Sequence, residues 1–336
     1  MSWDWGYMLN LKSKKSYDWL QDALKSVCQN AFQVDPSLQV HSIEPRQNRS
    51  FPHLEYQFVL EASDTQLRLV LRLYQGLFSL WGGTDNLKAS KEYSVLRHVY
   101  QYGYPSPFPY CFSPSLKPFG YPYIILDPGD GFRWWESEES LSYYQERMAN
   151  ALAESLARLH LSIQARHPLI PTVELHTVFS RLWSRVRHLG NDELKNLFKL
   201  CGRCIREQYT STWVLLHGCL DLDHTLLSLE KVRTVVNWEH TAIGDPRWDV
   251  AYTALALQRE NDRSLSNQLI ARYVQLTNNP LTDLGFWEGF IALRNYALCQ
   301  WVRSLDSKSY PAVIGLQAEI LQRESEFRLC ALRQFT

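Results

Sequence analysis

The chain has 336 residues, 45% of them hydrophobic, which is enough for two lobes or domains with a large buried core and argues against wholesale disorder. Lys plus Arg and Asp plus Glu both number 35, a balance that argues against nucleic acid or a membrane surface as the main partner. No apolar run reaches membrane-spanning length, and the seven cysteines follow no disulfide framework, so we expect a cytoplasmic protein with reduced thiols.

The first part of the chain predicts a small lobe that mixes helix and strand. Apolar residues recur at a helical period in two segments, and apolar runs bounded by turn residues mark three strands. The first two strands form a hairpin, and a Pro-rich turn precedes the third, which is short and buried. The predicted helices are 16–34 and 88–102, and the predicted strands are 56–61, 66–74 and 121–126.

A run of Asp, Pro and Gly at residues 127–131 breaks the chain, and we place the boundary between the lobes there. Residues 1–126 then form the first lobe, and residues 127–336 form a second lobe that is mainly helical. Two short strands, at 226–228 and 234–236, interrupt the helices and pair as a hairpin. The predicted helices of this lobe are 140–162, 193–209, 248–259, 264–277, 284–306 and 310–332.

Three short motifs in the second lobe are the most informative part of the sequence. Each follows or lies between short apolar segments. The motifs are His217-Gly218-Cys219 with His224 five residues later, Val236-Asn237-Trp238, and Gly244-Asp245-Pro246 with Asp249.

In this order and spacing, the motifs resemble the catalytic half of the aminoglycoside phosphotransferase and choline kinase-like family. The similarity covers roughly residues 40–304, with weaker matches in LRLVLRLY at 67–74, GYPSPFPY at 103–110 and ALAESLARLH at 151–160. It implies an α+β, bilobal protein kinase-like fold. The N-lobe would hold an N-terminal helix, a small antiparallel sheet and one packed helix, and the larger, mainly helical C-lobe would hold the catalytic-loop hairpin.

The residues at the chemical positions of the family depart from its pattern. Cys219 lies where the family has its catalytic Asp, and a thiol is a weak hydrogen-bond acceptor. His224 and Asn237 lie at the two metal positions, although Mg²⁺ prefers carboxylate, carbonyl and water oxygens. His217 is retained, and the resemblance gives it the role of bracing the loop. We therefore expect a catalytically impaired, pseudokinase-like protein with a binding or regulatory role.

Two alternatives remain open. An active ATP-dependent phosphotransferase, or kinase, acting on a small-molecule hydroxyl could use displaced acids, with Asp223 or Glu239 as a substitute. A different transferase chemistry could use Cys219 as a thiolate nucleophile, which requires a cationic neighbour that lowers its pKa.

The resemblance also suggests a nucleotide site in the first lobe and at its end. Arg72 falls where the family has its phosphate-reaching basic residue, and Glu92 falls where the partner of that residue lies. Leu126 and Asp127 occupy the hinge, where backbone groups would meet an adenine. The family normally has glycine in the loop that approaches the phosphates, whereas residues 41–61 of this chain contain none.

ATP with Mg²⁺ is thus the implied cofactor, while the departures at His224 and Asn237 argue against firm metal binding. We expect a small molecule or a protein partner in the cleft between the lobes, with neither nucleic acid nor membrane as a partner. We also expect Arg72 to pair with Glu92, and Cys219, His224 and Asn237 to converge at the floor of that cleft.

Overall fold

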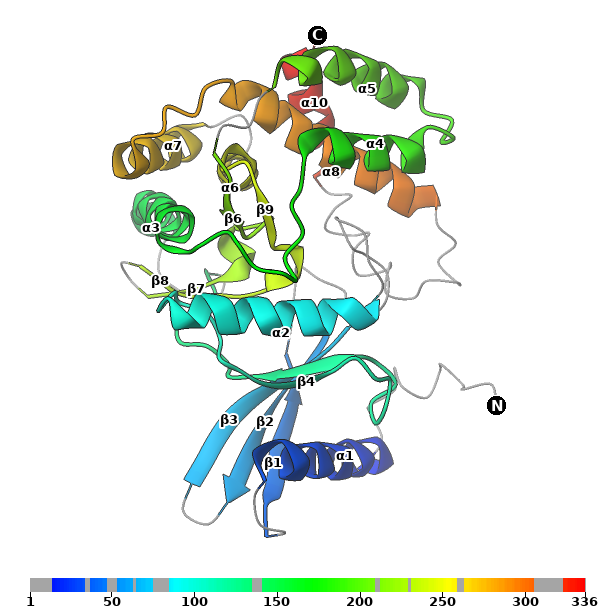
Figure 1. Ribbon diagram of the computed structural model, residues 1–336, viewed down its shortest axis with the longest axis vertical. Coiled ribbons are helices and arrows are strands. Elements are labelled where there is room, and N and C mark those ends of the chain that lie inside the picture. The colour runs from blue at the N-terminus through cyan, green and yellow to red at the C-terminus, as the bar shows by residue number, and fades with distance from the viewer. Residues whose placement is uncertain are drawn as a thin grey trace.

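The computed structural model of the protein has a sheet with two helices at one end and a group of helices at the other (Figure 1). This arrangement confirms the predicted α+β fold, with an antiparallel sheet in the N-lobe and a mainly helical C-lobe. The structure describes residues 14–33, 37–46, 53–62, 65–74, 85–134, 141–208, 212–228, 231–258, 263–304 and 323–335.

The N-lobe sheet has the strand order β1-β2-β3-β5-β4, and all neighbours are antiparallel. The predicted hairpin and the short buried strand are present as β2, β3 and β5. The sequence prediction missed β1 and β4, which are the edge strands and carry the prolines that an edge tolerates. The strands are β1 (Gln39–Pro45), β2 (Leu54–Ala62), β3 (Thr65–Leu73), β4 (Pro109–Ser113) and β5 (Tyr123–Leu126).

The two faces of the sheet pack against different helices. Helix α1 (Lys14–Phe32) covers one face, where Leu71 and Ile125 join its hydrophobic cluster, and α2 (Asp85–Gln101) covers the other, where Ile124 joins a second cluster. Side chains alternate between faces along a strand, so Arg72, which follows Leu71, points towards α2. The alternation of side chains along β3 thus places the buried cation of Arg72 next to α2, which carries its partner Glu92.

The C-lobe helices pack into two hydrophobic clusters. One joins α3, α6 and α7, and the other joins α4, α5, α8 and α10. Helix α4 was not predicted, and residues 305–322 of the last two predicted helices lie outside the described residues. The helices are α3 (Leu141–Ser162), α4 (Leu175–Val186), α5 (Asp192–Cys204), α6 (Arg247–Leu257), α7 (Ser264–Thr277), α8 (Leu284–Ser304) and α10 (Glu324–Phe335).

Two short antiparallel strand pairs lie between the sheet and the helices of the C-lobe (Figure 1). The predicted hairpin is β7 (Thr225–Leu227) with β8 (Val232–Val235), while β6 (Val214–Leu216) pairs with the unpredicted β9 (Ala242–Gly244). These pairs hold the loops that carry the three motifs. Within the described ranges, no helix is long and apolar enough to cross a membrane, and all seven cysteines are free thiols.

Candidate functional site

The loop that follows β6 is held by the carboxylate of Asp249, in the first turn of α6. Its two oxygens accept hydrogen bonds from the backbone N–H groups of His217 at 2.7 Å and Gly218 at 2.8 Å. The indole of Trp248 donates to the carbonyl of Gly218 at 3.1 Å. Gly218 has a φ of +91°, and a Cβ there would lie 2.2 Å from the carbonyl oxygen of His240. Only glycine therefore fits at this position of the loop.

His217 joins this loop to the turn that follows β8. Its Nε2 donates to the carbonyl of Val236 at 3.0 Å, and its ring lies edge-on to Trp238 and 5.9 Å from the ring of His224. The Sγ atom of Cys219 lies 3.8 Å from its Nδ1. Burial, helped by His224, lowers the pKa of His217 to about 4. The ring is therefore neutral near pH 7, with its proton on Nε2 and an unprotonated Nδ1 that accepts from the thiol S–H of Cys219.

Cys219 is a buried, protonated thiol. Only 2% of the residue is exposed, and burial together with the charges of Asp221 and Glu239 raises its pKa well above the ordinary value. A thiol in this state is neither a general base nor a nucleophile at neutral pH. The environment therefore works against the thiolate alternative as well as against a carboxylate-like role.

His224 ends a short 3₁₀ turn, Leu222–His224, that Asp221 caps. One oxygen of Asp221 accepts both the backbone N–H of His224, at 3.0 Å, and its Nδ1–H, at 2.6 Å. Burial alone would raise the pKa of Asp221, but the charge and hydrogen bonds of His224 outweigh it, so the pKa is lowered. The carbonyl of His224 accepts from the backbone N–H of Val236 at 2.9 Å, which ties the turn to β8.

Asp223 points towards the segment after the hinge. Its carboxylate accepts from the indole N–H of Trp134 at 2.7 Å, and its carbonyl accepts from Arg133 at 2.6 Å. Burial and the neighbouring charge of Asp221 raise its pKa. The carboxylate is therefore held by an indole and is easier to protonate than an ordinary Asp.

Asn237 is the least satisfied polar side chain of the site. The residue is 1% exposed and has a left-handed backbone with φ +65°. Neither its amide nitrogen nor its amide oxygen has a hydrogen-bond partner within the described part of the chain. Buried amides are normally hydrogen-bonded, so Asn237 differs in this respect from most buried polar side chains.

The donors at the two metal positions do not fit a magnesium-type cation. Asn237 offers one uncharged oxygen, and the imidazole of His224 is already bonded to Asp221. Hard divalent ions take several oxygens, of which carboxylates supply the charge. Among the described residues, no group of three or more His, Cys, Asp or Glu side chains is arranged to hold a metal ion.

On the N-lobe side, the expected pair of Arg72 and Glu92 is present. The guanidinium Nη1 lies 2.5 Å from Glu92, its Nε lies 2.7 Å from Glu55, and all three side chains are buried. Glu92 also accepts from the backbone N–H of Trp238 at 3.0 Å and from the hydroxyl of Tyr74. Glu55, opposite Arg72 in the β2–β3 register, was not predicted. Two carboxylates therefore compensate the one cation expected to meet phosphate.

Glu239 is a second buried carboxylate that joins the lobes. Its oxygens lie 3.0 Å from the Nε2 of His53, 3.1 Å from that of His240 and 4.0 Å from the Nζ of Lys88. Lys91 donates to its backbone carbonyl at 3.1 Å. Burial would raise the pKa of Glu239, but His53 and His240 lower it well below the ordinary range. Glu239 is thus an anion that already lies beside two imidazoles and the ammonium group of Lys88.

The sequence prediction missed His53, Lys88 and Lys91. A signal for Lys88 was present, because it lies four residues before Glu92 on the predicted helix and so shares one face with it. No local pattern pointed to His53, which meets Glu239 only through the folded chain.

The hinge residues are ordered by contacts of their own. Leu126 is buried in the core beside α2, and the backbone N–H of Asp127 donates to the carbonyl of Phe108 at 3.0 Å. The carboxylate of Asp127 accepts from the N–H groups of Phe108 and Gly129, both at 2.8 Å. The N–H of Asp127 is thus already used, and adenine binding by this pair stays a prediction. Residues 47–52 of the glycine-free segment lie outside the described residues.

Cys219, His224 and Asn237 lie around the ring of His217. The first two flank His217, and Asn237 lies between Val236 and Trp238, which both contact the same imidazole. The N-lobe helix α2 reaches this cluster through Glu92. The site is therefore a junction between the lobes.

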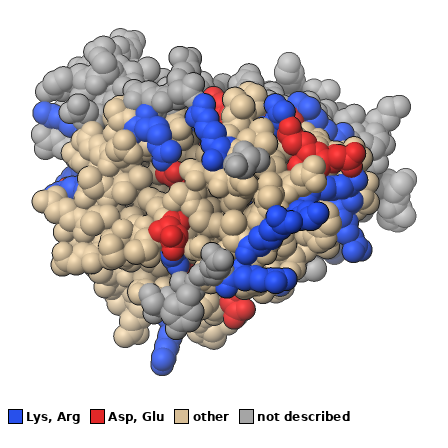
Figure 2. All heavy atoms as spheres, turned by 90° about the horizontal axis from the view of Figure 1, so that it is seen from above, with Lys and Arg blue, Asp and Glu red and all other residues tan. Residues whose placement is uncertain are grey.

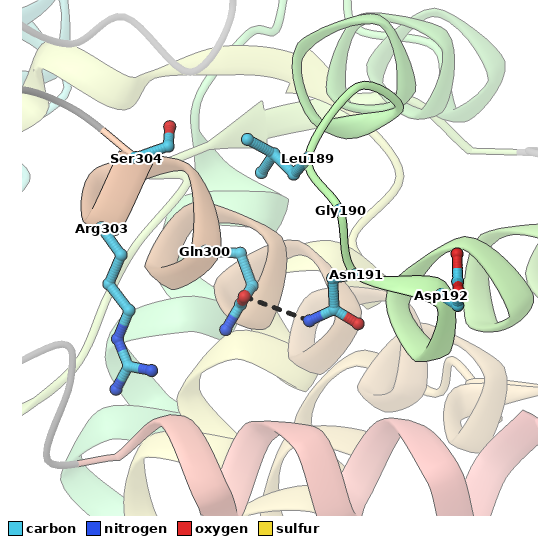
Figure 3. A pocket seen from close by; sticks show the side chains of 7 residues that line it. All are labelled: Leu189, Gly190, Asn191, Asp192, Gln300, Arg303 and Ser304. Atoms are coloured by element: carbon cyan, nitrogen blue, oxygen red, sulfur yellow. Dashed lines mark hydrogen bonds between the residues drawn. The ribbon is translucent and has the colours of Figure 1, made fainter.

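Hollows lined by described residues lie elsewhere in the C-lobe. One lies between the segment before α5 and the end of α8, where Asn191 donates to Gln300 (Figure 3). Another is lined by Glu193, Lys199 and Arg203 of α5. The face of the molecule over the helical lobe carries both charge signs among many uncharged residues (Figure 2). Neither hollow is lined by a residue of the three motifs.

The family of the chain follows from comparison with known families. A model of the phosphotransferase enzyme family, APH, matches residues 54–285, more than half of the chain. The chain belongs to this family. The resemblance inferred from the motifs is therefore confirmed. No curated protein sequence matches the chain significantly.

Solved structures share the fold of this phosphotransferase-family chain at low identity. A candidate aminoglycoside phosphotransferase of Ralstonia eutropha JMP134 is 14% identical with a TM-score of 0.68, covering 93% of this chain and 97% of its own. The GDP complex of aminoglycoside 2′-phosphotransferase-IIIa is 17% identical with a TM-score of 0.60, covering 92% and 99%. Choline kinase LicA of Streptococcus pneumoniae is 11% identical with a TM-score of 0.59, covering 92% and 99%.

Replacement of Asp249 by Ala is expected to lower the free energy of unfolding by about 3–5 kcal/mol, because it leaves two buried N–H groups and the nearby His160 ring without their acceptor. Urea unfolding at pH 7.5 measures this change. Asp192→Ala is the matched control, since that carboxylate is 91% exposed, and it should cost no more than about 0.5 kcal/mol. Equal losses in the two variants would contradict the bracing role.

Stability is expected to fall as the pH drops below about 6.5. Burial lowers the pKa of His217 and His240 from 6.5 to about 4; Glu239 partly opposes the shift at His240, and Arg294 and Lys88 add to it. Between these values the unfolded chain binds protons that the folded chain does not, so each ring removes on the order of 3 kcal/mol by pH 4.

Urea midpoints measured from pH 7.5 to pH 5 test this linkage. The midpoint should decrease throughout the range, and His240→Asn should make the decrease shallower because it removes one of the two titrations. A midpoint that does not change with pH would show that these rings are not buried in their neutral form.

Proposed function

We propose that this family member no longer transfers phosphoryl groups at a useful rate and instead acts as a binding or regulatory protein. The observation that carries the proposal is Cys219, a buried and protonated thiol at the position where the family has its catalytic Asp. Loss of a general base costs roughly 10²–10⁴-fold in rate. The partner is a small molecule or a protein held where the lobes meet.

The metal positions support the same proposal. Phosphoryl transfer depends on cations that bridge the phosphates and neutralise the charge that develops there. Asn237 is uncharged and His224 is bonded to Asp221, so the two positions lack the anionic oxygens that attract Mg²⁺. Loss of both metal positions together with the base is hard to combine with ordinary kinase chemistry.

Nucleotide binding, if retained, is weak and independent of metal in this proposal. The structure of aminoglycoside 2′-phosphotransferase-IIIa, which has this fold, is a complex with GDP and supports a nucleotide as the ancestral ligand. In this chain, however, Glu55 and Glu92 surround Arg72, and Glu239 adds a third buried carboxylate nearby. These anions oppose a polyphosphate that arrives without cations of its own.

One observation favours the alternative of an active phosphotransferase acting on a small-molecule hydroxyl. Asp223 is partly buried, and burial with the charge of Asp221 raises its pKa, which is how proteins tune a carboxylate for proton transfer. Its bond to Trp134 fixes its orientation. This alternative requires ATP with Mg²⁺ as cofactor and Asp223 in the role of base.

Thermal-shift titration with millimolar ATP tests the proposal. We expect a small increase in the melting temperature, or none, and no difference between samples with Mg²⁺, with Mn²⁺ and with EDTA, because a ligand stabilises only the state that binds it. An increase of several degrees that depends on Mg²⁺ would favour the active enzyme, and Asp223→Asn would then show whether the displaced acid supports turnover.

Restoring the family residues should rebuild the lost chemistry. The triple variant Cys219→Asp, His224→Asn and Asn237→Asp is expected to gain Mg²⁺-dependent nucleotide binding or slow ATP hydrolysis, measured by thermal shift and phosphate release. Each single variant should gain little, because the metal needs both ligands and the base acts on a metal-bound substrate. A native protein that hydrolyses ATP with Mg²⁺, and loses this activity in Asp223→Ala, would overturn the proposal.

A further inference from the structure

A groove on the surface of the C-lobe lies between α5 and α10, away from the three motifs. Residues of α5 from Glu193 to Arg203 line one side, and Leu332 of α10 lines the other. The groove has a volume of about 590 Å³, and ligand pockets usually measure roughly 300–1,000 Å³. It is therefore large enough to receive several side chains of a partner.

The floor of the groove is apolar. Leu197 is buried, whereas Leu200 and Leu332 are each partly exposed. Leu332 packs against the hydrophobic cluster that joins α5, α8 and α10, so the floor is continuous with the core of the lobe. An apolar centre inside a polar rim is the usual composition of a protein interface.

The rim that α5 contributes is positively charged. Residues 194–206 contain four cations and no Asp or Glu, although acidic residues flank this segment at both ends. Lys199 and Arg203 line the groove and are exposed, and their spacing of four residues places them on one side of the helix. Arg206 follows three residues later and is also exposed. The view from above shows neighbouring Lys and Arg side chains on this face of the lobe (Figure 2).

Glu193 is the acidic residue of the lining, and Arg328 of α10 compensates its charge. The two oxygens of Glu193 accept from Arg328, at 2.6 Å from Nε and 2.5 Å from Nη2. These hydrogen bonds lower the pKa of Glu193, so the pair is charged and mutually neutralised at pH 7. Lys199 and Arg203 then give the lining a net positive charge.

We propose that this groove binds an acidic, amphipathic helix of a partner protein. The segment of α5 from Glu193 to Arg203 extends for about 15 Å, which is the length of about three turns of a second helix laid along it. Apolar side chains on one face of that helix cover the leucines of the floor. Asp or Glu side chains beside them meet Lys199 and Arg203, since complementary charge fixes the orientation of a partner.

Two features favour an acidic helix over other anions. The floor is apolar, and the phosphate backbone of a nucleic acid offers no side chains to cover it. The charge of the whole chain is balanced, so long-range attraction to nucleic acid or to an anionic membrane is weak. The inference goes beyond the proposed loss of phosphoryl transfer, because no residue of the groove lies at the junction of the lobes.

Fluorescence anisotropy with a labelled model peptide tests the proposal. The probe is a helical peptide of about four turns, with Leu at every third or fourth position and Glu at the flanking positions. Its control peptide has Lys in place of every Glu. We expect the full-length protein to bind the acidic peptide at least about tenfold more tightly than the control, and to lose affinity as the NaCl concentration rises.

Variants assign the binding to the groove. Lys199→Glu and Arg203→Glu should each weaken binding of the acidic peptide by about tenfold, because each turns an attraction into a repulsion. Leu200→Gln removes apolar surface from the floor without a change of charge and should also weaken binding. Lys195→Glu is the matched control, since it makes the same charge change on the same helix outside the lining, and it should alter the affinity by no more than about twofold.

Equal binding of the two peptides, or binding that survives in the Lys199→Glu, Arg203→Glu and Leu200→Gln variants, would overturn the proposal. Tighter binding to phosphatidylserine vesicles or to poly(U) RNA than to the acidic peptide would overturn it in favour of a membrane or a nucleic acid. A dimer in sedimentation equilibrium that Lys199→Glu dissociates would overturn it in favour of a second copy of this chain. None of these results bears on the proposed function, which is measured by metal-dependent nucleotide binding and phosphate release.

Discussion

The junction of the lobes depends on the buried carboxylate of Glu92. It accepts from Arg72 and Tyr74 of the sheet and from the backbone N–H of Trp238 in the C-lobe, so one side chain connects β3, α2 and the turn after β8. A buried carboxylate is tolerated only when all of its acceptor positions are used. The position of the sheet relative to the catalytic-loop hairpin is therefore set by a few charge-assisted hydrogen bonds.

Around Glu92, the buried charged side chains of the chain contact one another. Arg72 is compensated by Glu55 and Glu92, and Glu239 lies 4.0 Å from the Nζ of Lys88 and within about 3 Å of the rings of His53 and His240. Buried ion pairs add little net stability, yet removal of one partner is costly, so such networks specify geometry more than they strengthen it. These networks therefore define how the two lobes are arranged.

In the C-lobe, the residues that shape the loop after β6 are retained, whereas the residues at its chemical positions differ from the family pattern. Asp249, Gly218 and His217 still shape the loop, through two backbone hydrogen bonds, a positive φ that excludes a side chain, and a contact with Val236. The chemical positions on that frame hold a neutral thiol and an amide that has no hydrogen-bond partner among the described residues. A frame can stay in place while the side chains that it positions differ, because the chemistry of a site depends on those few side chains.

The sequence by itself determined the β2–β3 hairpin and most helices, because these follow from periodicity. The order of its motifs determined the family, and the resemblance to that family implied the pairing of Arg72 with Glu92. It missed the edge strands β1 and β4, whose short, Pro-containing segments carry little pattern of their own. Tertiary structure alone decided that Glu55 meets Arg72, that His53 meets Glu239, and that Cys219 is a buried, protonated thiol. These features arise from register and burial that join residues far apart in sequence, and burial sets the protonation of the thiol.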